Sequence, residues 1–342
     1  MPVVSVAFMT KYRGQFELNR PATLIAALPA ILGFVPEKSL VLVSLAAGEL
    51  GSVMRADLCD ELADRVGHLA ELVAAANPAA AIAVIVDANG AALSQRDIVL
   101  WAAHVVDRVA AGGRWHCVDG CGCSGVIDDP SASPLAMAAV LDGRQLYPRR
   151  SDLQAVIAVD DPVRSAELAV ALGHQAADRE IAHRADSVGC SRQDVENALA
   201  AAARVADGQS LSDTELARLG CALGDARVRD MLYALAVGEN AGAAESLWAL
   251  LARVLPEPWR VEALVLLAFS AYARGDGPLA GVSLQAALCC EPGHRMAGML
   301  DTALQSGLRP EHIRDIAVTG YQRAEQLGIR LPPRRAFGQR AG

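Results

Sequence analysis

Short β-like runs and longer helical patterns alternate along the first half of the chain. The segments VVSVAF (residues 3–8) and SLVLVSL (residues 39–45) are rich in β-branched residues, as strands usually are. The second run is followed by the turn-like AAGELG and then by SVMRADL. Two apolar runs joined by such a turn predict a β-hairpin.

A helix is predicted between these two runs. Asn19 can cap its first turn, and Pro21 fits a first-turn position because its missing N–H would have no partner there. The helix carries PATLIAALPAIL, and Gly33 favours its end. Pro29 is expected to kink this helix or to end it early.

Beyond Asp57 the pattern continues as an alternation of helices and strands. The predicted elements are a helix over 60–76, a strand over 81–87, a helix over 94–111 and a strand over 114–118. Helices in this order usually connect parallel strands through crossovers. We therefore predict an α/β domain over residues 1–160, with a mixed, partly parallel sheet and helices on both faces.

Helical patterns alone continue from Asp161 onward. They follow one another with short breaks at Gly, Asp or Pro, and no strand pattern remains. Ser212 and Glu215 have the spacing of a capping box, in which each side chain bonds the other residue's backbone N–H. This spacing predicts the start of one helix.

A repeat is visible in this helical half. Pro258 and Pro292 each follow a helical pair and lie 34 residues apart, which is the period of tetratricopeptide repeats. Between them, residues 259–274 and 279–290 are predicted to form two antiparallel helices. We expect an all-α domain of tetratricopeptide-like hairpins over residues 161–330.

Composition and charge narrow the classes of function. Hydrophobic residues make up 53% of the chain and aromatic ones only 4%, so the core is built mainly from Ala, Leu and Val in close-packed helices. A net charge of −8 does not attract phosphate backbones, so nucleic acid is not an expected partner. No signal peptide and no membrane span are recognisable, which predicts a cytoplasmic protein with mostly reduced cysteines. The Arg-rich tail over residues 331–342 is expected to be flexible.

Five ordered segments carry a resemblance to a family. They are LNRPATLIAALPAILGFVPEKSLVLVSL (18–45), RADL (55–58), RWHCVDGCGCSG (114–125), VLDGRQLYPRRSDL (140–153) and LLAFSAYARGDGPLAGVSLQAALCCEPGH (266–294). Together they resemble the actinobacterial domain-of-unknown-function family numbered 4192. The resemblance covers nearly the whole chain and implies an architecture but no particular activity. Cys121 and Cys123 depart from the adjacent Cys-Cys-Pro of the family pattern, which weakens the case for a fixed role of that pair.

Cys117, Cys121 and Cys123 place three thiols within seven residues, beside His116. Thiolates bind zinc, so these three cysteines are the candidate metal ligands. Their spacing differs from that of a zinc knuckle, however, and no second Cys-rich pair completes four ligands. A redox or disulfide-forming pair, a catalytic cysteine and a loop with incidental thiols are the alternatives. No other cofactor is expected.

A ligand-binding cleft is predicted at the strand ends of the α/β domain. The loop over residues 119–134 follows a predicted strand and combines thiols, carboxylates and glycines. Ligands of open α/β sheets bind at this edge. We expect Trp115, Asp128 and Arg144 to lie around one cleft with these cysteines, and Arg144 to favour anionic ligands.

A second group of arginines lies near the junction of the two predicted domains. Arg144, Arg149 and Arg150 follow one another closely, while Arg55 and Asp57 stand at a predicted strand end. Arginine pairs suit phosphate and carboxylate groups, so these residues are candidates for an anion-binding corner. Solvated side chains or salt bridges between domains are the alternative.

Two functions remain open. The first is a binding or adaptor protein, in which the helical domain presents its surface to a protein partner and the strand ends hold a small ligand. The second is an enzyme with its active site in the Cys-rich loop over residues 117–129. The absence of a known catalytic motif favours the first. Neither interpretation calls for a membrane partner, and both leave the oligomeric state open.

Overall fold

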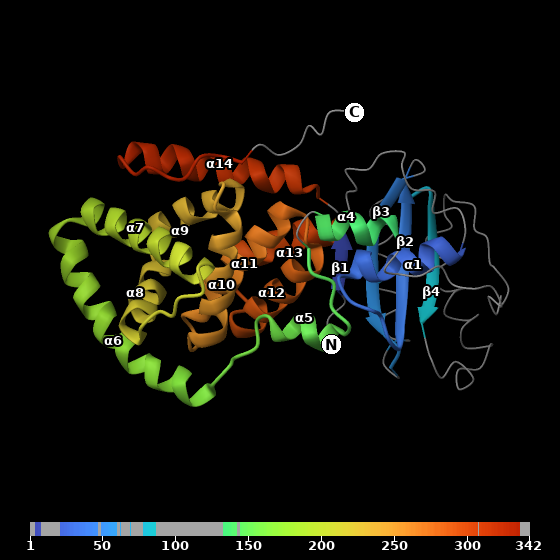
Figure 1. Ribbon diagram of the computed structural model, residues 1–342, viewed down its shortest axis with the longest axis horizontal. Coiled ribbons are helices and arrows are strands. Elements are labelled where there is room, and N and C mark those ends of the chain that lie inside the picture. The colour runs from blue at the N-terminus through green and yellow to red at the C-terminus, as the bar shows by residue number, and fades with distance from the viewer. Residues whose placement is uncertain are drawn as a thin grey trace. The chain divides into compact units, whose positions relative to one another are not determined.

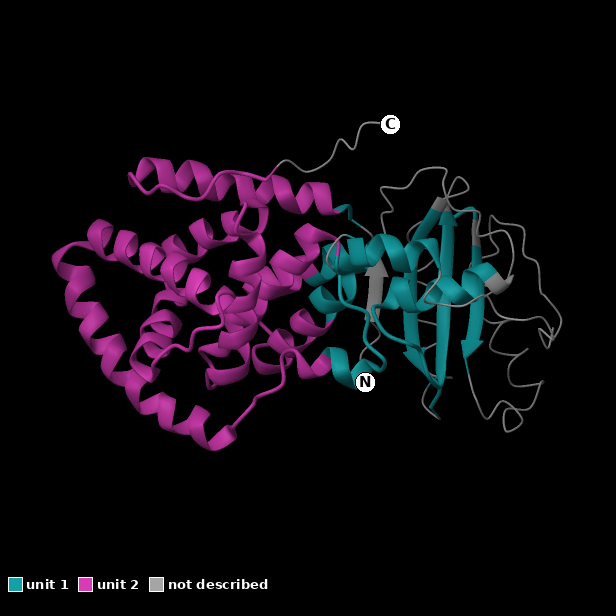
Figure 2. Cartoon of the chain, in the orientation of Figure 1, with its two compact units in different colours: residues 1–153, 276–281, 301–309 teal, residues 154–275, 282–300, 310–342 magenta. Residues whose placement is uncertain are grey.

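A computed structural model of the chain divides into two compact units (Figure 2). Unit 1 comprises residues 1–153, 276–281 and 301–309, and unit 2 comprises residues 154–275, 282–300 and 310–342. The structure describes residues 4–7, 21–46, 49–59, 62, 69, 78–86, 133–141, 144–306 and 308–335. The domain limits expected from the sequence, residues 1–160 and 161–330, stay predictions.

Unit 1 contains a small antiparallel sheet (Figure 1). Its strands are β1 (Val4–Ala7), β2 (Ser39–Ala46), β3 (Glu49–Asp57) and β4 (Ala80–Val86), in the spatial order β1-β3-β2-β4. Strands β2 and β3 pair with Leu42 opposite Met54. The predicted hairpin is therefore confirmed, because β2 and β3 follow each other in the chain and pair antiparallel.

The expectation of a partly parallel sheet is not confirmed. Each neighbouring pair among the four described strands is antiparallel. Strands β3 and β4 both run antiparallel to β2 and so point the same way, but β2 lies between them. β3 and β4 thus follow each other in the order of strands along the chain but have one strand between them in the sheet, as in a split β-α-β unit. The strand predicted over residues 114–118 lies outside the described residues.

Both faces of β2 are buried. On one face, Leu40 and Leu42 join a core cluster with residues of β3 and β4. Leu62 and Leu69, which are helical and seven residues apart, belong to the same cluster and are fully buried. On the other face, Val41 is also fully buried. A strand buried on both faces explains the nearly continuous apolar run of its sequence.

The remaining described helices of unit 1 are α1 (Pro21–Leu32), α4 (Pro134–Leu141) and the start of α5 (Arg150–Ala155). Helix α1 contacts α4. It begins at Pro21 as predicted and continues through Pro29, so it does not end early. Gly33 follows it with a φ of +77°, and a Cβ there would lie 2.9 Å from the Cβ of Pro278. Glycine is required at this turn both for the backbone conformation and for space.

Helices make up the regular structure of unit 2 that is described (Figure 1). They are α6 (Pro162–Ala185), α7 (Ser187–Ala206), α8 (Asp213–Leu223), α9 (Ala226–Leu232), the 3₁₀ helix η2 (Tyr233–Val237), α10 (Ala241–Val254), α11 (Arg260–Arg274) and α14 (Pro310–Gln326). Helices α12 (Gly277–Cys290) and α13 (Arg295–Gln305) have residues in both units. Of the helices that the structure describes, none combines the length and apolarity needed to cross a membrane.

The core of unit 2 forms around α11. Each of its residues from Ala263 to Ala273 is buried. It contacts α8, α10, α14 and η2. A helix that is apolar on nearly all sides is stable only where neighbours surround it, and the Ala- and Leu-rich sequence of α11 fits this position.

Two local predictions for the helical half can be compared with the structure. The capping box at the start of α8 is confirmed, because Ser212 Oγ accepts from Glu215 N and Ser212 N donates to Glu215 Oε2 at 2.8 Å. Helices α11 and α12 lie where two helices were predicted, with Gly275 between them at a φ of 92°. A tetratricopeptide-like packing of these helices is not confirmed.

Candidate functional site

Most of the predicted site residues lie outside the described part of the chain. These are Trp115, Cys117, Cys121, Cys123 and Asp128. Arg144 is described: it follows α4 with a half-buried side chain, and its backbone N–H donates to the carbonyl oxygen of Ala139 at 2.8 Å. The shared cleft and the zinc site therefore stay predictions. Within the described ranges, no group of three or more His, Cys, Asp or Glu residues is arranged to hold a metal ion.

The predicted anion-binding corner is assembled in part. Arg55, Asp57 and Arg150 form two ion pairs that share the carboxylate of Asp57. Arg149 is not a member of this group: its side chain is exposed, and its backbone N–H donates to Asp152. Sequence reasoning found this group because the strand end and the arginine-rich segment were both recognisable.

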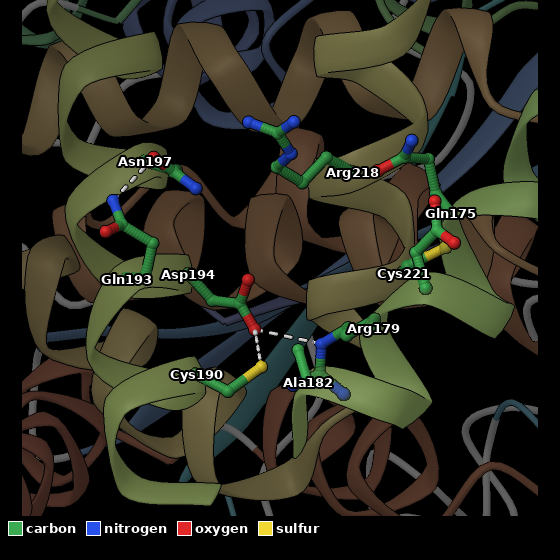
Figure 3. Close-up of a pocket in the computed structure, with 10 residues that line it drawn as sticks. Gln175, Arg179, Ala182, Cys190, Gln193, Asp194, Asn197, Arg218 and Cys221 are labelled. Carbon is green, nitrogen blue, oxygen red and sulfur yellow. Dashed lines mark hydrogen bonds and ion pairs between the residues drawn. The ribbon is translucent and has the colours of Figure 1, made fainter. Parts of the chain in front are cut away.

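A pocket of about 340 Å³ lies in unit 2 among α6, α7 and α8 (Figure 3). Its walls carry carboxamide, carboxylate, guanidinium and thiol groups. The lining residues are Gln175, Asp178, Arg179 and Ala182 of α6, Cys190, Gln193, Asp194 and Asn197 of α7, and Arg218 and Cys221 of α8. Pockets that bind small molecules or parts of larger partners usually have volumes of about 300 to 1,000 Å³.

A one-residue joint sets α6 and α7 beside each other. The backbone N–H of Asp186 bonds to Ala182 O at the end of α6, and its carboxylate accepts from Gly189 N at the start of α7. The same residue thus caps both helices. A Cβ on Gly189 would lie 2.2 Å from the Asp186 carboxylate, so only glycine leaves room for this cap.

An Asp–Arg–Asp cluster lies at the pocket. Arg179 Nε donates to Asp194 Oδ2 at 2.9 Å, and Arg179 Nη2 donates to Asp225 Oδ2 at 2.7 Å. Asp225 also caps α9 by accepting from Arg227 N, and His183 Nε2 lies 3.6 Å from its carboxylate. The three side chains of the cluster are 19%, 7% and 12% exposed for Arg179, Asp194 and Asp225. Their interaction is therefore only weakly screened by water.

The two carboxyl groups of this cluster titrate differently. Burial raises the pKa of Asp194, and the charge and hydrogen bond of Arg179 only partly offset it. Burial acts on Asp225 in the same sense, but the hydrogen bonds from Arg179 and from Arg227 N outweigh it and lower the pKa. The number of hydrogen bonds to each carboxylate accounts for this difference.

The two thiols of the pocket are not activated. Cys190 Sγ lies 3.9 Å from Asp194 Oδ2, and Cys221 Sγ lies 3.4 Å from Leu172 O. Burial raises the pKa of both thiols, and the nearby carboxylate of Asp194 adds to the effect. A nucleophilic or redox-active cysteine needs the opposite shift. The thiolate form of both cysteines is therefore disfavoured in this pocket.

Several polar groups of the pocket remain available to a ligand. Figure 3 shows one carboxylate oxygen of Asp194 bonded to Arg179 and Cys190, while the other points away from both. Asp178 and Arg218 are exposed, and neither has an ion-pair partner among the residues that the structure describes. Among the lining residues, the carboxylates of Asp178 and Asp194 balance the guanidinium groups of Arg179 and Arg218, and Asp225, which pairs with Arg179 without lining the pocket, adds one negative charge. The region carries an excess of negative charge when His183 is neutral.

Sequence reasoning missed this pocket although one signal was present. The buried face of α7 includes Ser191, Val195 and Ala198, and Asp194 lies on it. An acidic residue on the apolar face of a helix must find a partner, because an unpaired buried charge is costly. The partner, Arg179, lies on a different helix, which the pattern of α7 alone does not reveal.

Fold and pocket together define a class of protein: a chain with a small antiparallel sheet and a helical unit that holds a polar pocket lined by both carboxylate and guanidinium groups. The chain belongs to the family described as domain of unknown function (DUF4192), whose family model matches residues 21–311. No curated protein and no solved structure matches the chain.

Proposed function

We propose that the protein is a binding or adaptor protein whose helical unit receives a basic group of a partner in the pocket among α6, α7 and α8. The observation that carries this proposal is the Asp–Arg–Asp cluster with a carboxylate oxygen of Asp194 left over. The second oxygen of Asp194 has no bond to any residue that the structure describes, and such a carboxylate oxygen attracts a hydrogen-bond donor, with a charged donor gaining most.

Arg218 supports a more specific ligand. Arg218 lines the same pocket as Asp194, so its positive charge acts on a cation bound there. An isolated cation is repelled by Arg218, whereas an acidic group next to that cation pairs with it. The preferred ligand is therefore a segment in which a Lys or Arg side chain stands beside an acidic one. Gln193 Nε2 donates to Asn197 Oδ1 at 3.1 Å, so Gln175 and the remaining amide groups of Gln193 and Asn197 are the ones that can bond the backbone of such a segment.

The alternative function is an enzyme with its active site in the loop over residues 117–129. That loop lies outside the described residues, so the alternative stays a prediction. The protonated thiols Cys190 and Cys221 do not add to it, because they lack the lowered pKa of a catalytic cysteine. The pocket in unit 2 therefore favours the binding function.

The test uses two capped peptides that differ in one charge. The first is a Lys-Gln dipeptide and the second is a Lys-Glu dipeptide, both acetylated and amidated so that only the side chains are charged. Calorimetric titration of the whole protein is expected to show tighter binding of Lys-Glu than of Lys-Gln. Asp194→Asn should weaken both by about tenfold or more, since it removes the carboxylate that holds the cation.

Arg218→Gln provides the sharper variant. It is expected to strengthen binding of Lys-Gln and to weaken binding of Lys-Glu, which reverses or abolishes the preference. The matched control is Asp213→Asn on the same helix, because Asp213 pairs with Arg164 and does not line the pocket. If the wild-type protein binds neither peptide, or if Asp194→Asn binds both as tightly as wild type, the proposal is wrong.

A further inference from the structure

Arg55, Asp57 and Arg150 form a charged cluster in unit 1. Arg55 lies on β3, Asp57 ends that strand, and Arg150 begins α5. Arg55 Nη2 pairs with one carboxylate oxygen of Asp57, and Arg150 Nη1 pairs with the other at 3.3 Å. Two guanidinium groups share one carboxylate, so the cluster carries an excess positive charge.

Arg55 is held firmly in this cluster. Its side chain is 5% exposed, Nε donates to Ser39 Oγ at 2.8 Å, and Nη2 lies 3.4 Å from Glu37 O. The guanidinium also lies over the ring of Phe34, 5.8 Å from its centroid. Arg55 is thus a fixed cation whose own donors are largely used.

Arg150 has unused donors. Only its Nη1 is bonded, whereas Nε and Nη2 are buried and have no hydrogen-bond partner among the described residues. The whole side chain is 13% exposed. Its pKa lies below the usual value because burial and the charge of Arg55 disfavour the cation, with Asp57 acting in the opposite sense.

The two free nitrogens lie on the same edge of the guanidinium plane. Their N–H bonds are nearly parallel and match the two oxygens of a carboxylate, or two oxygens of a phosphate group. A charged donor pair buried without partners is unfavourable, and an anion both satisfies the donors and neutralises the excess charge.

We propose that this edge of Arg150, with Arg55 beside it, is a binding site for an oxyanion group, either a carboxylate or a phosphate. Arg150 makes the paired hydrogen bonds, Arg55 adds a second positive charge, and Asp57 holds both guanidinium groups in place. Because both free nitrogens are covered by protein, the covering atoms move aside when the anion binds. The site lies in unit 1 and does not depend on the proposed function of the pocket in unit 2.

The experiment follows the Nε–H resonance of Arg150 in the whole protein by ¹⁵N–¹H NMR. Its assignment comes from its loss in Arg150→Lys. Sodium acetate and sodium phosphate are titrated separately, with sodium chloride adjusted to keep the ionic strength constant. A saturable shift with acetate identifies a carboxylate site, and a shift at lower concentration with phosphate identifies a phosphate site.

Arg150→Lys keeps the positive charge and the pairing with Asp57 but loses the paired donors. Anion affinity, measured from the rise in the midpoint of thermal unfolding, should fall about tenfold or more in this variant. The matched control is Arg149→Lys, which changes the adjacent exposed arginine in the same way and should bind as wild type does. The proposal is overturned if neither anion shifts the Arg150 Nε–H resonance. That result is expected if the edge of Arg150 binds only a water molecule. It is equally overturned if Arg150→Lys retains the wild-type affinity.

Discussion

Two ionic clusters in this protein have opposite compositions. In unit 1, the carboxylate of Asp57 stands between Arg55 and Arg150. In unit 2, the guanidinium of Arg179 stands between Asp194 and Asp225. Each cluster has a central group that serves two partners of the other sign. The first therefore has one positive charge too many, and the second one negative charge too many.

The comparison shows which member of such a cluster has unused hydrogen-bond donors or acceptors. The central group bonds both partners, and in each cluster one outer member also keeps an unused donor or acceptor. In unit 1 it is the edge of Arg150, and in unit 2 it is the second oxygen of Asp194. An outer arginine attracts an anion and an outer carboxylate attracts a cation, so the two units are suited to ligands of opposite charge.

Removing the centre of the unit 2 cluster should give the largest loss of stability. Arg179→Ala leaves Asp194 and Asp225 close together without their shared cation, and both carboxylates are at least 88% buried by their exposures of 7% and 12%. The free energy of unfolding is expected to fall by about 3 to 5 kcal/mol. Urea denaturation measures it. Arg218→Ala, on the exposed side of the same pocket, should change it by no more than about 0.5 kcal/mol, and equal effects of the two variants would contradict the prediction.

Removing the centre of the unit 1 cluster should cost less. Asp57 is 36% exposed, and Arg55 keeps its bond to Ser39 in Asp57→Asn. A loss of about 1 to 3 kcal/mol is expected. Added phosphate should restore stability to Asp57→Asn more than to wild type, because the variant has two uncompensated arginines. Glu37→Gln, an exposed position two residues before β2, is the control. If phosphate stabilises Asp57→Asn no more than it stabilises wild type, the cluster does not carry an excess of positive charge.

The two carboxylates of unit 2 should respond to pH in opposite senses. Asp194 has a raised pKa in the folded state, so it stabilises the wild-type fold at low pH. This stabilisation is lost as the pH rises above about 3.9 and through the folded-state pKa. Asp225 has a lowered pKa, and its contribution is present above about pH 3.9 and lost as the pH falls. Relative to wild type, Asp194→Asn should gain stability as the pH rises, and Asp225→Asn should lose it.

These pH effects are measured by urea denaturation between pH 3 and 7. Asp178→Asn, which changes an exposed carboxylate of the same pocket, is expected to follow wild type across the range. If the two variants shift in the same direction, the assignment of different surroundings to Asp194 and Asp225 is wrong.

An exposed ion pair in unit 2 is expected to give the smallest effect of these predictions. Arg204 pairs with Glu215 with both side chains more than one third exposed. The pKa of Glu215 is lowered to about 2, first by the backbone and side-chain hydrogen bonds from Ser212 and then by Arg204. Ser212→Ala and Arg204→Ala should each raise this pKa only in part, as followed by NMR titration, because the hydrogen bond from the backbone N–H of Ser212 remains in both variants. The stabilisation by Glu215 is present above its usual pKa of about 4.3 and lost as the pH falls toward 2. A return of the pKa to about 4.3 in either variant would contradict the leading role of the backbone N–H of Ser212.

The elements that sequence reasoning predicted well are those set by local rules. The β2–β3 hairpin, the limits of α1 and the capping box of α8 depend on residues a few positions apart. The placement of β2 between β3 and β4 depends instead on contacts between segments distant in the chain, which no local pattern encodes. Tetratricopeptide-like packing, which was inferred from a single 34-residue period, also depends on contacts between separate helices and is not confirmed.

The two ionic clusters show the same limit for sites. Arg55, Asp57 and Arg150 were recognised because a strand end and an arginine-rich segment are visible in the sequence. Arg179 and Asp225 lie 46 residues apart on elements that give no sign of meeting. Asp194 on the buried face of α7 indicated a buried partner without identifying it.

The joint at Asp186 has a consequence for how this pocket tolerates changes in chain length. One residue ends α6 and starts α7, so the connection has no slack that could absorb an insertion. A helix turns by roughly 100° and advances about 1.5 Å with each residue. A single residue added after Asp186 would thus rotate α7 by more than a quarter turn relative to α6, carrying Asp194 away from Arg179. An insertion or deletion in a surface turn alters only that loop. At this joint it would rotate α7, and with it every pocket residue that α7 carries.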